Sequence, residues 1–135
     1  MFLVDTSVWI ELFRQRPSVS LADLGGLEEV VTCLPVIQEV LQGFGDPAAY
    51  RIAREAMFAL PIVESPLSSP LVEEAVDLYR SARRAGVTPR SSVDCLIAAC
   101  ALRHELPVAH CDRDYAQLAR VSALRELDLS VGRRR

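Results

Sequence analysis

The stretch from Ser91 to Arg103 constrains the fold more than any other part of the chain. Its centre, residues 93–102, contains ten residues, and Asp94 is the only charged one among them. At 100° per residue the apolar side chains cover every side of a helix, which predicts a helix buried on most of its faces. Ala98, Ala99 and Ala101 are small and allow neighbouring elements to approach closely. We therefore expect this helix to lie inside a packed core.

Asp94 stands in the first turn of this helix and has two interpretations. Ser91 or Ser92 can cap the helix, and the spacing Ser91-x-x-Asp94 is that of a capping box with Asp in place of the usual Glu. The helix dipole also favours a negative charge at this end. The alternative is a functional carboxylate, because a buried acid is costly unless something compensates it. The local sequence alone favours the cap.

Length and composition predict one globular domain covering residues 1–135. Half of the residues are hydrophobic and 24% are charged, as in folded chains. The longest apolar run, residues 96–102, is too short to span a bilayer, and the N-terminus lacks the basic region of a signal peptide. The four cysteines include no C-x-x-C pair, which argues against a zinc site or a disulfide framework. We expect a reduced, cytoplasmic protein with no membrane attachment.

The charged residues are unevenly distributed. The net charge of −3 speaks weakly against nucleic-acid binding. Four arginines nevertheless cluster in the second half of the chain, where they are either contacts for a nucleic-acid backbone or an ordinary solvated helix face: Arg80, Arg83, Arg84 and Arg90.

Short apolar runs alternate with helical patterns along the chain. Strands are expected at residues 2–4, 30–34 and 107–110, with an edge strand at 127–131 and a strand or loop at 62–63. Helices are expected at residues 8–15, 35–44, 48–60, 71–86, 91–103 and 114–119. Residues 56–60 and 71–85 are expected to pack as an antiparallel helical hairpin. The alternation predicts an α/β fold, a three-layer α/β/α domain with a mostly parallel central sheet.

Two acids directly follow predicted strands. Asp5 follows residues 2–4, and Asp112 follows residues 107–110. Both should lie at the carboxyl edge of the sheet, where open α/β sheets bind ligands. A right-handed crossover can bring Asp94 to the same edge. Carboxylates gathered in one cleft repel one another unless a cation neutralises them, and oxygen ligands without His or Cys suit Mg²⁺ or Mn²⁺. These residues predict an acidic metal site.

Four motifs in this order make the whole chain resemble a PIN domain of the VapC type, the ribonuclease half of bacterial toxin–antitoxin pairs. They are F-L-V-D-T-S-V-W-I at the N-terminus, V-I-Q-E-V, S-V-D-C-L-I-A-A and H-C-D-R-D-Y. The resemblance implies that the acidic quartet of the family corresponds to Asp5, Glu39, Asp94 and Asp112. The helical period alone places Glu39 about 130° from the apolar face of its helix, on a flank with no special role.

The resemblance also implies roles and partners. Asp5 and Asp94 would bind Mg²⁺ or Mn²⁺ most directly, Glu39 and Asp112 would complete the site, and Asp114 could share the fourth role. The family's hydroxyl near the site matches Thr6 or Ser7. The expected activity is metal-dependent endoribonuclease cleavage by attack of water. The expected partners are an RNA substrate, a VapB-type antitoxin and a second copy of the chain in a homodimer.

Two alternatives remain from the sequence. The first is a catalytically inactive PIN-like interaction module whose acids are structural caps. The second is a phosphotransfer domain of the doubly wound type. A receiver domain would need a downstream Lys, which this chain lacks, and a haloacid-dehalogenase-like phosphatase would need D-x-D where D-T-S stands.

Overall fold

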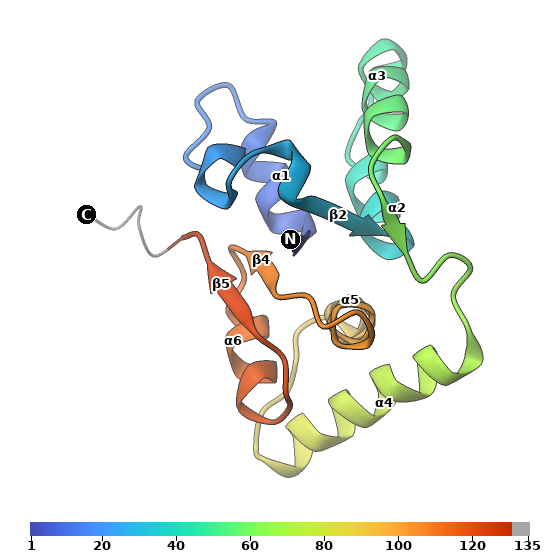
Figure 1. Cartoon of the computed structure of the whole chain (residues 1–135), viewed down its shortest axis with the longest axis vertical. Coiled ribbons are helices and arrows are strands. Elements are labelled where there is room, and N and C mark those ends of the chain that lie inside the picture. Colours follow the sequence, from blue (N-terminus) through green and yellow to red (C-terminus); the bar gives the residue numbers. More distant parts are fainter. Residues whose placement is uncertain (131–135) are drawn as a thin grey trace.

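The computed structural model describes residues 1–130, and Figure 1 shows the arrangement of their elements. The five strands are β1 (Phe2–Val4), β2 (Val30–Cys33), β3 (Ile62–Val63), β4 (Val108–His110) and β5 (Glu126–Asp128). The six α-helices are α1 (Thr6–Leu12), α2 (Leu34–Gln42), α3 (Pro47–Phe58), α4 (Ser69–Arg84), α5 (Ser92–Arg103) and α6 (Arg113–Arg120). Two short 3₁₀ helices, η1 (Leu21–Leu24) and η2 (Leu27–Glu29), precede β2. The α/β fold predicted from the sequence is confirmed.

All strands of the sheet are parallel, in the order β3-β2-β1-β4-β5. The chain leaves β1 toward β2 on one side, whereas β4 joins β1 on the other side. Leu3 pairs with Val108 and Val4 with Ala109 in this central pair of strands. The strand order therefore reverses between β1 and β4, and their carboxyl ends open the crevice in which such sheets bind ligands.

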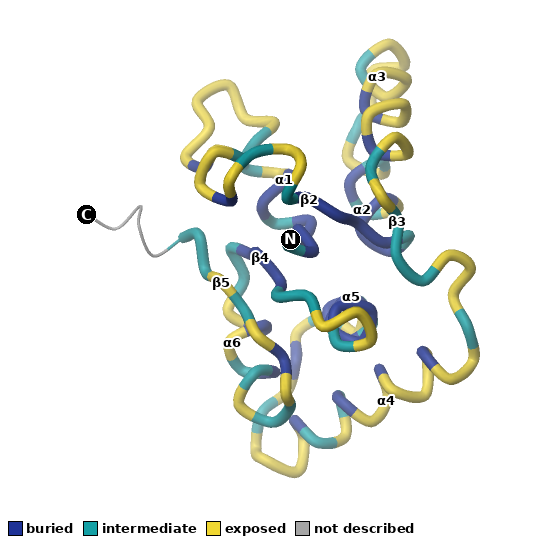
Figure 2. The backbone as a smooth tube through the Cα atoms, viewed as in Figure 1, coloured by how far each residue is buried: buried dark blue, intermediate teal, exposed yellow. Residues whose placement is uncertain are grey.

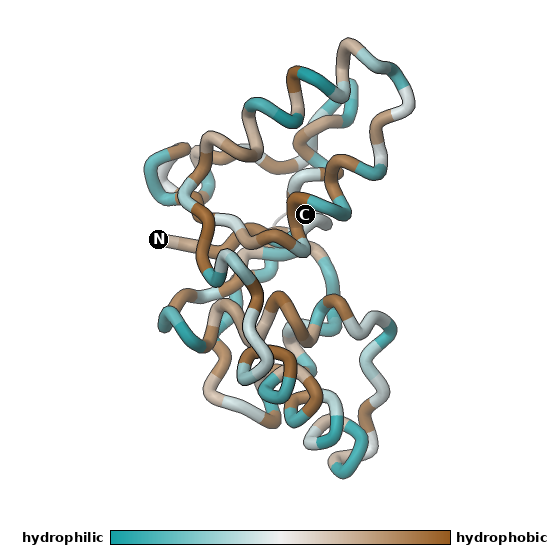
Figure 3. The backbone as a smooth tube through the Cα atoms, turned by 90° about the vertical axis from the view of Figure 1, so that its right-hand side faces the viewer, coloured by the Kyte–Doolittle hydropathy of each residue, from teal (hydrophilic) through white to brown (hydrophobic). Residues whose placement is uncertain are grey.

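The helix predicted to be buried is the centre of the core. Of the twelve residues of α5, seven are buried, and Ile97, Ala98 and Ala99 are 0% exposed. Figure 2 shows α5 as a largely dark blue coil, while α4 is mostly yellow with dark blue positions on the side toward α5. Figure 3 shows the apolar segments running through the middle of the molecule. The small side chains of α5 let α4, α6 and α2 all pack against it.

Two groups of helices cover the sheet. α4, α5 and α6 contact one another, and α1, α2 and α3 form the second set. The chain runs across the sheet from β1 to β3 and then back past β1 to β5. Figure 1 shows the two sets of helices on opposite sides of the strands, as right-handed crossovers in these two directions require. The result is the three-layer arrangement expected from the sequence.

The predicted helical hairpin of residues 56–60 and 71–85 is wrong. α3 packs against α2, while α4 packs mainly against α5, and Figure 1 shows α3 and α4 at opposite ends of the molecule. The reason is β3, which lies between them in the chain and pairs with β2 at the edge of the sheet. This pairing separates the end of α3 from the start of α4.

The last strand is at an edge of the sheet, as expected, but it is shorter than residues 127–131. β5 ends at Asp128, whose Oδ1 accepts a hydrogen bond from the backbone N–H of Ser130 over 2.8 Å. This local turn ends the strand, and Val131 lies outside the described residues. No helix within residues 1–130 is long and apolar enough to cross a membrane.

Candidate metal centre

Asp5 lies where β1 ends and α1 begins, and its carboxylate is held on both sides. It caps α1, because Oδ2 accepts hydrogen bonds from the backbone N–H and the hydroxyl of Ser7 over 3.0 and 2.6 Å. The Ser7 hydroxyl in turn accepts the backbone N–H of Cys111 over 2.9 Å, which ties α1 to the end of β4. Oδ1 of Asp5 accepts a hydrogen bond from the Tyr115 hydroxyl over 2.6 Å. The Asp5 carboxylate is therefore buried with a fixed orientation.

Asp94 is not the second half of a capping box, so the interpretation favoured by the local sequence is wrong. Ser91 caps α5, as expected, by accepting the backbone N–H of Val93, but within the described residues the Asp94 side chain makes no reciprocal bond to the backbone N–H of Ser91. Its Oδ1 accepts a weaker hydrogen bond from Tyr115 over 3.3 Å. Its Oδ2 is buried and has no hydrogen-bond partner within the described part of the chain. A carboxylate oxygen of this kind needs a cation or a proton.

When no cation is bound, the surroundings of Asp94 favour the protonated form of its carboxyl group. Burial, and after it the neighbouring carboxyl groups of Asp114, Asp5 and Asp112, together raise the pKa of the Asp94 carboxyl from its ordinary value of 3.8 to about 8. A cation placed among these groups would reverse the effect, because it stabilises the charged form.

Asp112 and Asp114 lie at the start of α6 beside Asp94. Asp112 caps α6 by accepting the backbone N–H of Asp114 over 3.0 Å, and Asp114 is 2% exposed. One oxygen from each of Asp94, Asp112 and Asp114 lies within 4.8 Å of the others. The sequence left open which of Asp112 and Asp114 belongs to the site, and the structure places both beside Asp94.

Glu39 reaches the same cleft from α2. The Thr6 hydroxyl donates a hydrogen bond to Glu39 Oε1 over 2.7 Å, which links the start of α1 to the flank of α2. Of the two hydroxyls considered from the sequence, Thr6 orients Glu39 and Ser7 orients Asp5. Glu39 is half-buried on the flank of its helix, as the helical period predicts.

The acids line one cleft with a volume of about 360 Å³ at the carboxyl ends of β1 and β4. Its lining residues are Asp5, Thr6, Ser7, Ile10, Glu39, Arg90, Ser91, Asp94 and Asp112. The donors are carboxylate and hydroxyl oxygens, the ligand set that Mg²⁺ and Mn²⁺ prefer. Together with the Asp94 oxygen that has no partner within residues 1–130, this chemistry fits a hard divalent cation.

Tyr115 is the residue of this site to which the sequence assigned no role. It is 0% exposed, and its hydroxyl lies between Asp5 and Asp94. Burial raises the pKa of the Tyr115 hydroxyl well above its ordinary value of 10, and the charges of Asp5 and Asp94 raise it further, so the group remains a donor. The signal in the sequence was the apolar face of α6, on which a tyrosine hydroxyl needs a buried partner.

His110 is a second side chain that the sequence did not connect to the site. It is 0% exposed, and its Nδ1 accepts the backbone N–H of Asp112 over 3.1 Å. Its Nε2 must then carry the proton, which it donates to Glu126 on β5 over 2.9 Å. His110 therefore orients the turn that carries Asp112.

The four arginines singled out from the sequence separate into two groups. Arg90 lies in the acidic cleft, whereas the other three lie on the exposed surface of the second half of α4 and do not line it. They are Arg80, Arg83 and Arg84.

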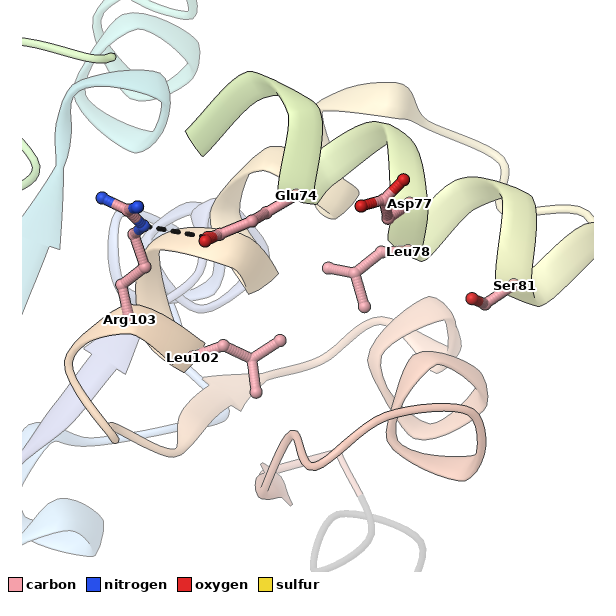
Figure 4. A pocket seen from close by; sticks show the side chains of 6 residues that line it. All are labelled: Glu74, Asp77, Leu78, Ser81, Leu102 and Arg103. Atoms are coloured by element: carbon pink, nitrogen blue, oxygen red, sulfur yellow. Dashed lines mark hydrogen bonds and ion pairs between the residues drawn. The ribbon is translucent and has the colours of Figure 1, made fainter. Parts of the chain in front are cut away.

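A second cleft, of about 320 Å³, lies between α4 and the end of α5. Figure 4 shows that its one basic side chain, Arg103, is already paired with Glu74 over 2.9 Å. Among its lining residues this cleft contains no group of converging acids comparable to the one beside Asp94. It is therefore not the candidate metal centre.

Comparison with known proteins agrees with the fold. A model of the PIN domain matches residues 2–121. Ribonuclease VapC11 of Mycobacterium tuberculosis is 36% identical over 135 aligned positions, covering 92% of this chain and 96% of that protein. This chain is a PIN domain of the VapC family. The VapC ribonuclease Mb1587 of Mycobacterium bovis matches the PIN domain with the same identity and coverage. The resemblance inferred from the four motifs is confirmed.

Solved structures share the fold of this PIN domain at lower identity. VapBC2 from Rickettsia felis, bound to a DNA fragment from its promoter, superposes with a TM-score of 0.75 at 14% identity, covering 94% of this chain and 97% of that chain. FitAcB from Neisseria gonorrhoeae superposes with a TM-score of 0.72 at 19% identity, covering 96% and 99%. At these identities the likeness is one of fold.

Proposed function

We propose that this PIN domain is the toxin of a type II toxin–antitoxin system and a metal-dependent endoribonuclease that hydrolyses RNA phosphodiester bonds. The observation that carries the proposal is the convergence of Asp5, Asp94 and Asp112 on one cleft, in which Asp94 Oδ2 is buried and has no partner among the described residues 1–130. The identity of 36% to proteins named as VapC ribonucleases supports the same reaction.

In this proposal each acid has a distinct task. Asp5 and Asp94 hold Mg²⁺ or Mn²⁺, with Asp112 as the third ligand and Asp114 behind it. When bound, such a cation lowers the pKa of a coordinated water and neutralises charge on a phosphate. Glu39 is held by Thr6 through Oε1 alone, so its Oε2 can accept the proton of the attacking water. Tyr115 and Ser7 fix the Asp5 carboxylate before the substrate arrives.

The proposed partners follow from the charge of the cleft. RNA phosphates are negatively charged, so they can approach the acidic cleft only when a cation is bound there. Arg90, on the wall of the cleft, offers a direct contact to the RNA backbone. A VapB-type antitoxin would silence the enzyme by placing an Arg or Lys among the same carboxylates. We further propose a homodimer in the cytoplasm, a reducing compartment that suits four cysteines that form no disulfide.

The proposal is tested by incubating the purified protein with total RNA in Mg²⁺ or Mn²⁺, and in EDTA. Asp94→Asn removes one charge from the site, and Asp77→Asn is the matched control, because Asp77 is an exposed acid on α4 outside the acidic cleft. We expect discrete fragments from the wild type and from Asp77→Asn with metal, and none from Asp94→Asn or in EDTA.

The opposite result would favour the inactive interaction module. If Asp94→Asn retains its circular dichroism spectrum and cleaves RNA like the wild type, the acidic cluster is not the catalytic site. If neither protein cleaves RNA while both are folded, the ribonuclease proposal is wrong for this chain.

A further inference from the structure

Arg90 bonds to both acids at the start of α6. Its Nη2 donates to Asp112 Oδ1 over 2.9 Å, and its Nε lies 3.6 Å from Asp114 Oδ1. Its backbone N–H donates to Asp114 Oδ2 over 2.8 Å. The main chain and the side chain of one residue thus hold two carboxylates together, and a planar guanidinium is suited to such a bridge.

These bonds determine which carboxylate oxygens remain for a cation. Both oxygens of Asp114 face Arg90, and the Asp114 side chain is 1% exposed. Asp112 Oδ1 accepts from Arg90 and from the backbone N–H of Asp114, which leaves Oδ2. Asp94 Oδ2 is buried and has no partner within residues 1–130. Among these three acids, the oxygens left for a cation therefore belong to Asp94 and Asp112. Asp5, the other proposed ligand, is joined to Asp94 through the Tyr115 hydroxyl.

We propose that Arg90 takes the place of a second divalent cation, so that the cleft binds a single Mg²⁺ or Mn²⁺. Paired metal ions in nucleases lie about 3.5–4 Å apart and share carboxylate ligands. A second ion here would need the Asp112 and Asp114 oxygens to which Arg90 is bonded. The guanidinium stays charged throughout the pH range in which proteins are folded, so it also repels a second ion. This inference rests on the metal site proposed above.

Such an arrangement gives Arg90 a positioning role for the substrate as well. Its side chain is 57% exposed, so N–H groups that are not bonded to the two acids face solvent. A guanidinium with five N–H donors can bind two carboxylates on one edge and a phosphate oxygen on another. Arg90 would thus supply at the phosphate the positive charge that a second metal ion supplies in two-metal enzymes.

The experiment counts the Mn²⁺ ions bound per chain by isothermal titration calorimetry and by electron paramagnetic resonance of the free ion. We expect one ion in the wild type and two in Arg90→Gln, because Asp112 and Asp114 lose their counter-ion. Arg113→Gln is the matched control, since Arg113 is exposed and lies between the same two acids in the sequence. It removes the same charge and should still bind one ion.

Any other number of bound Mn²⁺ ions contradicts either the role of Arg90 or the metal site. Two ions in the wild type, one in folded Arg90→Gln, or two in Arg113→Gln would overturn the role of Arg90 and leave the metal site standing. No ion in the wild type would overturn the proposed metal site itself. Arg90→Lys keeps one positive charge beside the buried Asp114 and should bind one ion. If Arg90→Gln does not fold, two ions in the wild type or in Arg90→Lys would still overturn the inference, and one ion in both would support it.

Discussion

Replacing Asp94 with asparagine is expected to stabilise the protein when no divalent cation is present. Asp94 is 5% exposed, and the carboxyl groups of Asp114, Asp5 and Asp112 lie around it. Its folded-state pKa of about 8 means that folding holds a proton on a group that would ionise in the unfolded chain. Asparagine has nearly the same shape, still accepts the hydrogen bond from Tyr115 through its oxygen, and offers its N–H₂ group to Asp114.

The size of the effect follows from the shift in pKa. With about 1.4 kcal/mol for each pKa unit, a rise from 3.8 to about 8 costs the wild type roughly 4 kcal/mol at pH 7. We expect Asp94→Asn to recover about 2–4 kcal/mol of this, since the new amide must also be desolvated. For a chain of this length that corresponds to a rise in Tm of roughly 6–15 °C.

The dependence on pH has a defined sign. Between pH 3.8 and about 8 the folded state binds more protons at Asp94 than the unfolded state does, so this group lowers stability as the pH rises. The stability difference between Asp94→Asn and the wild type should therefore widen from pH 5 to pH 8 and then level off. Below the unfolded-state pKa the difference in protonation disappears.

The assay is urea unfolding in EDTA at pH 5, 6, 7 and 8 for the wild type, Asp94→Asn and Asp77→Asn. A difference that does not grow with pH, or an Asp94→Asn protein less stable than the wild type at pH 8, would refute the reasoning. Adding Mn²⁺ should reverse the order, because only the wild type retains the ionised ligand and gains stability from binding.

Three further predictions concern the site, the core and the surface. Tyr115→Phe removes the donor that orients Asp5, and we expect about ten-fold weaker Mn²⁺ binding by calorimetry with the fold retained. Ala98→Leu inserts a larger side chain at a 0% exposed position of α5, and urea unfolding should show a loss of about 1–3 kcal/mol. Substituting the arginines of α4 with Gln in the Asp94→Asn background should weaken RNA binding and flatten its salt dependence by about 0.7 for each lost phosphate contact; an unchanged slope would make them an ordinary solvated helix surface. These are Arg80, Arg83 and Arg84.

Much of the fold follows from local patterns along the chain. The burial of α5 is visible in its uninterrupted apolar residues, and the positions of Asp5 and Asp112 after β1 and β4 are visible in the short strands before them. Such patterns suffice because the helical and strand periods depend on neighbours a few residues apart. The boundaries and the sheet edges also depend on capping groups, as the turn at Asp128 illustrates.

The contacts of the site depend on segments far apart in the sequence. Asp5 and Tyr115 are 110 residues apart, and Thr6 and Glu39 are 33 residues apart. These contacts depend on the placement of β1 beside β4 and of α1 beside α2. The periodicity of a single helix or strand does not predict which elements become neighbours. Asp94 is a further example. Its local spacing indicates a cap, whereas its packing makes it a buried acid whose Oδ2 has no partner in the part of the chain that the structure describes.

By itself, then, the sequence determined which elements form, which helix is buried and which acids stand at the ends of strands, because these properties depend on neighbouring residues. Only the tertiary structure decided that α4 packs on α5, that Tyr115 joins Asp5 to Asp94, and that Arg90 neutralises Asp112 and Asp114. The physical reason is that the order of parallel strands and the packing of helices bring distant charges together, and the charges then determine one another's protonation and cation binding.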